Sequence, residues 1–276
     1  MSGDLAVRGL TVRYSGRTVV DKVNLDVAEG RVLGLVGESG SGKSTIARAV
    51  LGLAPVHTGT ITVGGTELRR LNARERARRV QMVFQDPFGS LNPRMSVGSI
   101  VGEGLEARAA LRPAERGAEV TRLLELVSLS PEMEQRLPRR LSGGQRQRVA
   151  IARALAARPA VLIADEITSA LDVSVQAQVL NVLRGVLASE RLSMLFISHN
   201  LAVVRYISDD IAVMRDGVIV ETGPADEVLA APKHEYTREL LRAVPQLHAG
   251  AAAPDRSRTA TRLNSTPDEL GIHKHR

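Results

Sequence analysis

The chain has 276 residues, of which 43% are hydrophobic and 2% aromatic, and its formal net charge is +7. This size and apolar content allow one substantial core with a smaller satellite lobe. No apolar run reaches the roughly 20 residues that span a bilayer, and the first residues lack a signal-peptide pattern, so we expect a cytoplasmic protein. The absence of cysteine excludes disulfides, cysteine-ligated zinc and thiolate-held iron–sulfur clusters.

The positive charge makes nucleic acid or an anionic membrane surface a candidate partner. Among the 37 basic residues, however, only Lys22, Lys43, Lys233 and Lys274 are lysines, and the arginines are spread along the chain rather than gathered in one block. Aromatic residues are too few to interleave stacking platforms with the basic residues. We therefore expect no direct binding of nucleic acid.

The first part of the chain alternates between short strands and helices. An apolar run from 31 to 36 ends in a glycine-rich turn, which is typical of a strand that precedes a helix. The patterns predict strands at 23–27, 31–36, 60–63 and 81–85, and helices at 44–53 and 72–79.

Residues 86–159 are mostly helical in pattern, most clearly at 120–127 and 143–157, so we predict a helical insertion at about 87–158. A strand at 161–164, a helix at 174–188 and a strand at 193–197 follow. This alternation indicates a parallel sheet with helices on both faces, where ligands gather at the carboxyl ends of the strands. Residues 246–276 lack periodicity and predict a flexible tail, whose His273 and His275 are more simply solvated than metal-bound.

A phosphate-binding loop is predicted after the strand at 31–36. The segment matches G-x-x-x-x-G-K-[ST], in which glycines turn successive backbone N–H groups toward phosphate oxygens and the following helix N-terminus favours an anion. Lys43 would reach the β- and γ-phosphates of ATP, and Ser44 would ligate Mg²⁺. The alternative is an ordinary glycine-rich turn. The loop consists of Gly37, Glu38, Ser39, Gly40, Ser41, Gly42, Lys43, Ser44 and Thr45.

Two carboxylates end the predicted buried strand at 161–164. Asp165 is placed to hold the water shell of the metal, and Glu166 lies one step further, where a general base would polarise an attacking water. The alternative is that both acids cap the next turn.

A second helix start with exposed N–H groups is predicted at Ser142, Gly143, Gly144 and Gln145. Ser142 suits an N-cap, and the two glycines expose the first amides of the helix as a further phosphate site. By itself this pattern is also that of an ordinary helix start.

Taken together, these segments resemble the ordered motif set of ABC transporter ATPase subunits over roughly residues 5–245. The motifs are residues 37–45, Gln85, 141–145, Asp165-Glu166, 169–172 and His199. The resemblance implies an α/β P-loop NTPase fold with a mostly parallel sheet, an N-terminal antiparallel β portion and a helical insertion subdomain. It also implies that ATP is sandwiched in a head-to-tail dimer between the P-loop of one subunit and the signature loop, Ser142–Gln145, of the other.

The resemblance further implies roles for single residues. Tyr14 would stack on adenine, and Gln85 would link Mg²⁺ and the attacking water to the helical lobe. His199 would hold the γ-phosphate and orient Glu166, while Asp172 would lie in the loop that crosses the dimer interface. Each has a plainer alternative: a strand aromatic for Tyr14, a polar strand end for Gln85, a loop contact for His199 and a helix cap for Asp172.

Residues 80–95, 141–148 and 234–241 resemble, more narrowly, the importers of oligopeptides and dipeptides, a pattern shared with nickel and glutathione importers. The chain departs from the family at Ile167, where proline is usual, at Arg139-Arg140 in place of His-Glu, and at Glu235 in place of proline. Without proline we expect a freer turn after Glu166, with an added N–H donor.

We therefore expect an ATP-hydrolysing, energy-coupling subunit of an importer at the cytoplasmic face of the cell membrane. Its partners would be a second ABC ATPase subunit, identical or paralogous, and two transmembrane permease subunits, with an extracytoplasmic substrate-binding protein acting indirectly. The alternatives are a soluble ABC-type ATPase that acts on nucleic acid or ribosomes, and a regulatory module that binds ATP without efficient turnover.

Overall fold

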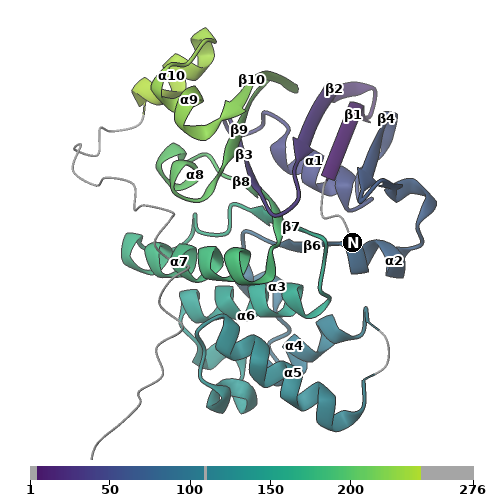
Figure 1. Ribbon diagram of the computed structural model, residues 1–276, viewed down its shortest axis with the longest axis vertical. Helices are drawn as coiled ribbons and strands as arrows, with labels where there is room; N and C mark the ends of the chain where they lie inside the picture. Colours follow the sequence, from purple (N-terminus) through teal and green to yellow (C-terminus); the bar gives the residue numbers. More distant parts are fainter. Residues whose placement is uncertain (1–4, 109–110, 244–276) are drawn as a thin grey trace, which may run out of the picture. The chain divides into compact units, whose positions relative to one another are not determined.

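Ten strands form two sheets in the residues that the computed structural model describes, 5–108 and 111–243 (Figure 1). The four-stranded sheet is antiparallel, in the order β2-β1-β4-β5. The six-stranded sheet, β10-β9-β3-β8-β7-β6, is parallel except for β10. The predicted mixture of parallel and antiparallel sheets is confirmed. The strands are β1 Leu5–Tyr14, β2 Arg17–Val27, β3 Val32–Val36, β4 Val56–Val63, β5 Thr66–Glu67, β6 Val80–Val83, β7 Val161–Asp165, β8 Ser193–Ile197, β9 Asp210–Arg215 and β10 Val218–Pro224.

Helices connect the strands, and every regular element described between β6 and β7 is helical. These elements occupy the region predicted as a helical insertion. As a separate subdomain, the insertion stays a prediction. The α-helices are α1 Lys43–Val50, α2 Ala73–Arg79, α3 Pro87–Ser90, α4 Val97–Leu105, α5 Pro113–Leu126, α6 Gly143–Ala156, α7 Val173–Glu190, α8 Leu201–Ile207, α9 Ala225–Ala230 and α10 Glu235–Ala243.

Alternating side chains of the parallel strands build two hydrophobic clusters. Leu33 and Leu35 of β3 face a cluster that also contains buried residues of α1 and of the antiparallel sheet. Val32 and Val36 of the same strand face a second cluster, formed with α4 to α8. Helix α1 therefore packs between the two sheets, while the other face of the parallel sheet carries the helices after β6 (Figure 1).

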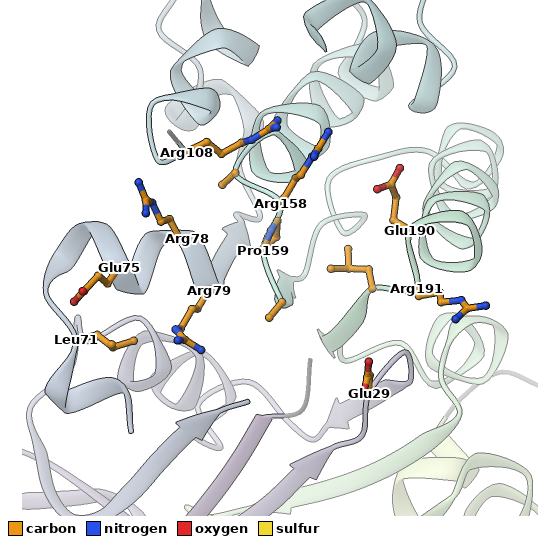
Figure 2. Close-up of a pocket in the computed structure, with 13 residues that line it drawn as sticks. Glu29, Leu71, Glu75, Arg78, Arg79, Arg108, Arg158, Pro159, Glu190 and Arg191 are labelled. Atoms are coloured by element: carbon orange, nitrogen blue, oxygen red, sulfur yellow. The ribbon is translucent and has the colours of Figure 1, made fainter. Parts of the chain in front are cut away.

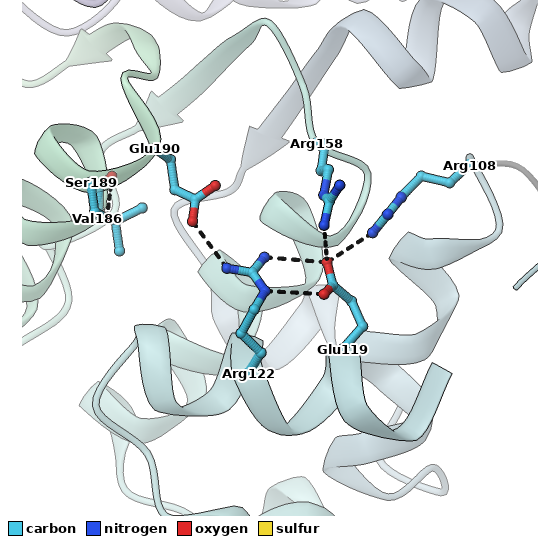
Figure 3. A network of polar contacts seen from close by, with 7 residues as sticks. All are labelled: Arg108, Glu119, Arg122, Arg158, Val186, Ser189 and Glu190. Atoms are coloured by element: carbon cyan, nitrogen blue, oxygen red, sulfur yellow. Dashed lines mark hydrogen bonds and ion pairs between the residues drawn. The ribbon is translucent and has the colours of Figure 1, made fainter. Parts of the chain in front are cut away.

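Three arginine–carboxylate contacts tie α5 to its surroundings, and a fourth lies within the helix (Figure 3). The carboxylate of Glu119 accepts hydrogen bonds from Arg108 at 2.8 Å, Arg122 at 3.0 Å and Arg158 at 3.1 Å. Arg122 also contacts Glu190 of α7 at 3.0 Å. These contacts, led by that with Arg122, hold the pKa of Glu119 down to about 2. Glu119 therefore links three segments that are distant in the sequence.

The predicted elements have the observed type, although β2 begins six residues and α5 seven residues before the predicted starts. Strand β8 has the predicted bounds, whereas β6 ends at Val83, so Gln85 lies in the loop beyond it. The predicted helix at 72–79 begins after Asn72, whose side chain accepts the Glu75 N–H in a capping box. The elements from α8 to α10 were not predicted.

No helix in the described ranges is long and apolar enough to cross a membrane. The tail predicted at 246–276, with His273 and His275, lies outside the described residues.

Candidate functional site

The predicted phosphate loop connects β3 to α1 through a backbone that requires glycine. Gly37 has φ +154° and Gly42 has φ +108°, both in a region that side chains disfavour. A Cβ on Gly37 would lie 2.1 Å from the carbonyl oxygen of Met214, and one on Gly42 would lie 2.8 Å from the Met214 side chain. The end of β9 thus packs against the loop so closely that only glycine fits.

Lys43, the first residue of α1, is folded back onto its own loop. Its ammonium donates hydrogen bonds to the carbonyl oxygens of Gly37 at 2.9 Å and Glu38 at 2.7 Å, and to Ser41 Oγ at 3.3 Å. Burial lowers the pKa of Lys43, while Glu166, Asp165 and Glu38 act in the opposite direction. A buried cation therefore sits beneath the loop.

Ser44 and Asp165 form a pair of oxygen ligands. The Ser44 hydroxyl donates to Asp165 Oδ1 at 3.2 Å, and Asp165, at the end of β7, is 9% exposed. Burial raises the pKa of Asp165, the hydrogen bond from Ser44 opposes this, and the neighbouring Glu166 raises it further. Hydroxyl and carboxylate oxygens are ligands that Mg²⁺ prefers, so the pair fits that ion.

Mg²⁺ commonly binds through one or two protein oxygens together with phosphate oxygens and waters. The part of the chain that the structure describes contains no cluster of three or more His, Cys, Asp or Glu side chains able to hold a metal. The Ser44–Asp165 pair supplies the one or two protein oxygens that such a site uses.

Glu166 and His199 meet beside this pair. Nδ1 of His199 lies 3.2 Å from Oε1 of Glu166, and the two residues follow the neighbouring strands β7 and β8. Glu166 has φ +49°, which is uncommon for a residue with a side chain and marks local strain. A carboxylate and an imidazole in contact can share a proton or orient each other.

The turn after Glu166 is tightly held although it lacks proline. The Glu166 amide donates to the carbonyl of Ile197 at 2.9 Å, and the Glu166 carbonyl accepts from the Ser169 amide at 3.1 Å and hydroxyl at 2.9 Å. The side chain of Ile167 is buried in the cluster that faces the helices. The expected freer turn is therefore anchored by packing and hydrogen bonds.

Gln85 reaches the same loop from the end of β6. Its amide donates to Ser169 Oγ at 3.2 Å, and the Ser169 hydroxyl donates to the Glu166 carbonyl. Because β6, β7, β8 and β3 are adjacent in the sheet, their carboxyl ends bring the predicted residues together. The residues are Gln85, Asp165, Glu166, His199, Lys43 and Ser44.

The second predicted phosphate site, Ser142–Gln145, lies at the start of α6. Ser142 accepts the Gln145 N–H at 3.3 Å and donates its own N–H to Gln145 Oε1 at 2.9 Å. A Cβ on Gly144 would lie 2.4 Å from Cγ1 of Val175, so α6 and α7 approach closely here. Within the described residues, no hydrogen bond or ion pair joins these side chains to the loop at 37–45.

Two further predicted residues stand apart from the carboxylates. Tyr14 ends β1 and is 38% exposed. Asp172 caps α7, accepting the Val175 N–H at 2.9 Å and the Ser174 hydroxyl at 2.8 Å, and these bonds lower its pKa. This contact matches the plainer reading of Asp172, and neither residue's predicted role is tested by its placement.

Several residues that shape the site were not predicted. Ser169 joins Gln85 to Glu166, Met214 and Gly217 pack on the phosphate loop, and the Tyr236 hydroxyl accepts the Glu38 N–H at 3.0 Å. These contacts join segments up to 198 positions apart, which local patterns do not report.

A cavity of about 610 Å³ lies elsewhere, among Arg79, Ala160 and Leu192 (Figure 2). These residues precede β6, β7 and β8, so the cavity lies at the amino ends of strands whose carboxyl ends carry the predicted site. It contains none of the predicted site residues. The chemistry-bearing residues, rather than this cavity, define the candidate site.

Comparison with known families agrees with the motif set. Residues 20–169 match the family described as ABC transporter, and residues 220–269 match the family described as oligopeptide/dipeptide transporter, C-terminal region. A protein of Brucella ovis named "Putative peptide import ATP-binding protein" is 48% identical over 248 residues, which cover 87% of this chain and 78% of that protein. A Brucella abortus protein with the same description is 48% identical over 239 residues, covering 84% and 71%.

Solved structures share the fold. The structure of cbiO1 from Clostridium perfringens, part of the ABC transporter complex cbiONQ, has a TM-score of 0.76 at 27% identity and covers 82% of this chain and 90% of that chain. A dimeric ATP-binding cassette in a post-hydrolysis state, bound to ADP and Pi, has a TM-score of 0.71 at 27% identity, with coverages of 80% and 98%.

Proposed function

Since this chain belongs to the ABC transporter family, as an ATP-binding subunit that couples ATP hydrolysis to transport, we propose how its site performs the reaction. The observation that carries the proposal is the meeting of Lys43, Ser44, Asp165, Glu166 and His199 at the carboxyl ends of adjacent strands. ATP binds with its phosphates in the loop 37–45, against the backbone N–H groups and the ammonium of Lys43.

Ser44 and Asp165 would hold Mg²⁺, and Gln85, just beyond the end of β6, would contact the same ion. When bound, the ion supplies positive charge that offsets the charge of the phosphates. The buried carboxylate of Asp165 gains a compensating cation on binding, which relieves the cost of its desolvation.

Glu166 accepts the proton of the attacking water, and His199 orients Glu166 through their 3.2 Å contact. Tyr14 stacks on the adenine. Ser169 links Gln85 to the turn that carries Glu166, because its hydroxyl accepts from the Gln85 amide and donates to the Glu166 carbonyl.

The loop 37–45 is half of the site. Ser142 and Gln145 bond each other at the start of α6, and this helix start serves the nucleotide of a second subunit. A head-to-tail dimer brings the two halves together, and Asp172 lies in the loop that crosses the interface. ATP hydrolysis in each site then requires that the dimer is closed.

The membrane partner docks on a groove of about 580 Å³ lined by residues of α2, β6, α4 and α6. Two of its apolar residues, Leu53 and Phe84, are 67% and 43% exposed, which suits burial by another protein. Phe84 lines the groove and directly precedes Gln85, so a cytoplasmic helix of a permease seated here contacts the neighbour of the residue that reaches the nucleotide site. A permease bound in this groove would therefore respond to movements of the segment next to the nucleotide site.

The chain accordingly acts at the cytoplasmic face of the membrane, with two permease subunits, in the import of peptides. The peptide cargo is supported by the C-terminal region at 220–269 and by the relatives described above. An extracytoplasmic binding protein delivers the peptide and touches the permeases rather than this chain.

The Glu166→Gln variant tests the mechanism. We expect Mg²⁺-dependent ATP hydrolysis to fall by about 10²- to 10⁴-fold while ATP binding persists and an ATP-bound dimer accumulates. Glu125→Gln, at an exposed position of α5, is the matched control and should hydrolyse ATP at the normal rate. An unchanged rate in Glu166→Gln would remove Glu166 from the role of base.

Docking is tested separately by co-purification with the permeases. Leu53→Asp should abolish recovery of the permeases from solubilised membranes without loss of ATP binding. Val218→Asp changes an exposed apolar residue outside the groove and should leave recovery unchanged. Equal recovery with both variants would place the membrane contact elsewhere.

A further inference from the structure

The backbone of the phosphate loop is bonded to the C-terminal helix α10. The N–H of Glu38 donates a hydrogen bond to the Tyr236 hydroxyl at 3.0 Å, across 198 positions of sequence. Tyr236 lies in the first turn of α10 and is 2% exposed. Glu38 itself is exposed, whereas Tyr236 is buried, so the bond ties a surface residue of the loop to a fixed hydroxyl.

Several contacts fix the ring and the backbone of Tyr236. The guanidinium of Arg215 lies 4.8 Å from the ring centroid, within cation–π distance. The Tyr236 N–H donates to His234 Nδ1 at 3.1 Å, and the Glu221 carboxylate accepts the N–H groups of Lys233 at 2.8 Å and His234 at 3.0 Å. Strand β10, which carries Glu221, therefore anchors the start of α10.

The segment that carries Arg215 also touches the phosphate loop. Met214 packs on Gly37 and Gly42, and the N–H of Gly217 donates to the Ser41 carbonyl at 3.0 Å. One short stretch at the end of β9 thus contacts the loop on one side and the Tyr236 ring on the other. Residues 214–217 therefore hold the Tyr236 side chain and the phosphate loop in fixed positions relative to each other.

Tyr236 and Lys43 bond the backbone N–H and the backbone carbonyl of Glu38, respectively. Glu38 donates its N–H to Tyr236 and accepts at its carbonyl from Lys43 Nζ at 2.7 Å. Rotation of the backbone at Glu38 would break both bonds, so the hydroxyl of α10 helps to fix one of the three acceptors that hold Lys43. Burial raises the pKa of Tyr236, which keeps the hydroxyl neutral at physiological pH.

We propose that Tyr236 is a positioning residue that preorganises the phosphate loop for ATP, so that the seating of α10 sets nucleotide affinity. The inference rests on the proposed binding of ATP at residues 37–45. A loop that is correctly shaped only part of the time binds its ligand more weakly by that fraction. Release of α10 would therefore weaken ATP binding without touching the groups that act on the attacking water.

Tyr236→Phe removes the hydroxyl and keeps the buried ring under Arg215. In the full-length chain we expect the Kd for MgATP to rise about three- to tenfold. The KM for ATP should rise by a similar factor, whereas kcat stays within about twofold because Glu166 and His199 are unchanged. A general structural defect would instead lower the amount of active protein and hence kcat.

Tyr206→Phe is the matched control. The Tyr206 hydroxyl also bonds a side chain, Asn181, and Arg184 lies 4.7 Å from its ring centroid, but Tyr206 belongs to α8 and has no contact with the loop among the described hydrogen bonds. Its Kd and KM should match those of the wild-type chain. Equal values for Tyr236→Phe, Tyr206→Phe and wild type would overturn the inference.

Amide hydrogen exchange without nucleotide tests the contact independently of ATP binding. In the wild-type chain the Glu38 N–H should exchange at least about tenfold more slowly than those of Ser39 and Gly40, and Tyr236→Phe should remove this difference. Fast exchange at Glu38 in the wild type would overturn the inference. Failure of the wild-type chain to bind MgATP would instead overturn the proposed function, while the exchange measurement would still decide whether Tyr236 holds the loop.

Discussion

Nδ1 of His199 lies 3.2 Å from Oε1 of Glu166, and this contact joins the residues that follow two adjacent parallel strands. Glu166 is also held through its backbone, by Ile197 on one side and Ser169 on the other. The backbone of Glu166 is thus held in place, and its carboxylate contacts His199. In the proposed mechanism, this carboxylate depends on the imidazole for its orientation toward the attacking water.

The dependence predicts a non-additive double-mutant cycle. We expect His199→Ala and Glu166→Gln each to lower the rate of ATP hydrolysis by about 10²-fold or more, and the double variant to be little slower than Glu166→Gln alone. When two residues depend on each other, the first substitution already removes the contribution of both, so the second substitution lowers the rate little further. Steady-state hydrolysis of the four proteins at saturating ATP measures the coupling.

His57→Ala provides the control for loss of an imidazole, because His57 is exposed on β4. It should leave the rate unchanged. If the effects of His199→Ala and Glu166→Gln instead multiply in the double variant, the two side chains act independently.

Asp165 should limit the stability of the nucleotide-free protein. Burial raises its pKa, so the folded state disfavours the carboxylate, and the free energy of unfolding falls as pH rises from the unfolded pKa through the raised folded pKa. The cost is therefore larger at neutral pH than in acid. Asp165→Asn removes the charge and keeps an oxygen for the Ser44 hydroxyl, so it should stabilise the chain by about 0.5–2 kcal/mol while Mg²⁺-dependent hydrolysis is lost.

Urea unfolding without nucleotide at pH 7 and at pH 4 measures this effect. The gain in Asp165→Asn should be larger at pH 7 than at pH 4, because acid protonates the native carboxyl. Asp226→Asn, an exposed change on α9, should show no comparable gain. A destabilised Asp165→Asn at pH 7 would show that the carboxylate holds the fold together instead of straining it.

Glu119 should have the opposite pH dependence. Its pKa of about 2 lies below the ordinary value of 4.5, so its contribution to stability is present above about 4.5 and is lost as pH falls toward 2. A shift of that size corresponds to about 3 kcal/mol, which solvent screening around its partly exposed arginines reduces to about 1–2 kcal/mol. Glu119→Gln should therefore lower the free energy of unfolding by that amount at pH 7.

Chemical unfolding at a series of pH values checks the network in Figure 3. The curves of wild type and Glu119→Gln should converge near pH 2. Glu115→Gln removes a carboxylate of the same helix that pairs only with the exposed Arg112 in the described contacts, and it should change stability little at any pH. A gap that persists unchanged at low pH would indicate lost packing, not lost charge.

Local sequence patterns predict the strands that carry most of the site because β3, β7 and β8 are uniformly buried. Strand β8 is five buried residues ended by a polar turn, and its bounds were predicted without error. Strand β6 was extended too far, to Gln85, because Phe84 continues the apolar run although it is partly exposed. The apolar pattern does not distinguish a buried strand residue from an apolar residue on an exposed groove.

The contacts between distant segments were beyond local patterns. Nothing near Tyr236 indicates that its hydroxyl accepts an amide of the phosphate loop, and nothing near Ser169 indicates that it bonds Gln85. These pairings follow from the order of strands in the sheet, which places β9 beside β3 and β6 beside β7. The motifs identified the reacting groups, whereas the topology determined what holds them.

Gly144 lies where α6 packs against α7, and the adjacent Val175 leaves no room for a side chain at this position. A Cβ would lie 2.4 Å from Cγ1 of Val175, an atom of a stiff β-branched side chain, so Gly144→Ala must push α6 away from α7. We expect a loss of about 1–3 kcal/mol in stability together with impaired ATP hydrolysis.

Gly185→Ala is the matched change, in the interior of α7, where a Cβ would meet nothing within 4 Å. Because alanine favours the helix over glycine, this variant should gain about 0.5–1 kcal/mol and hydrolyse ATP normally. Thermal unfolding and ATPase assays of both variants make the comparison. Tolerance of alanine at 144 would mean that α6 and α7 are free to separate, and the start of α6 would then not be held by packing in the orientation that a partner's nucleotide requires.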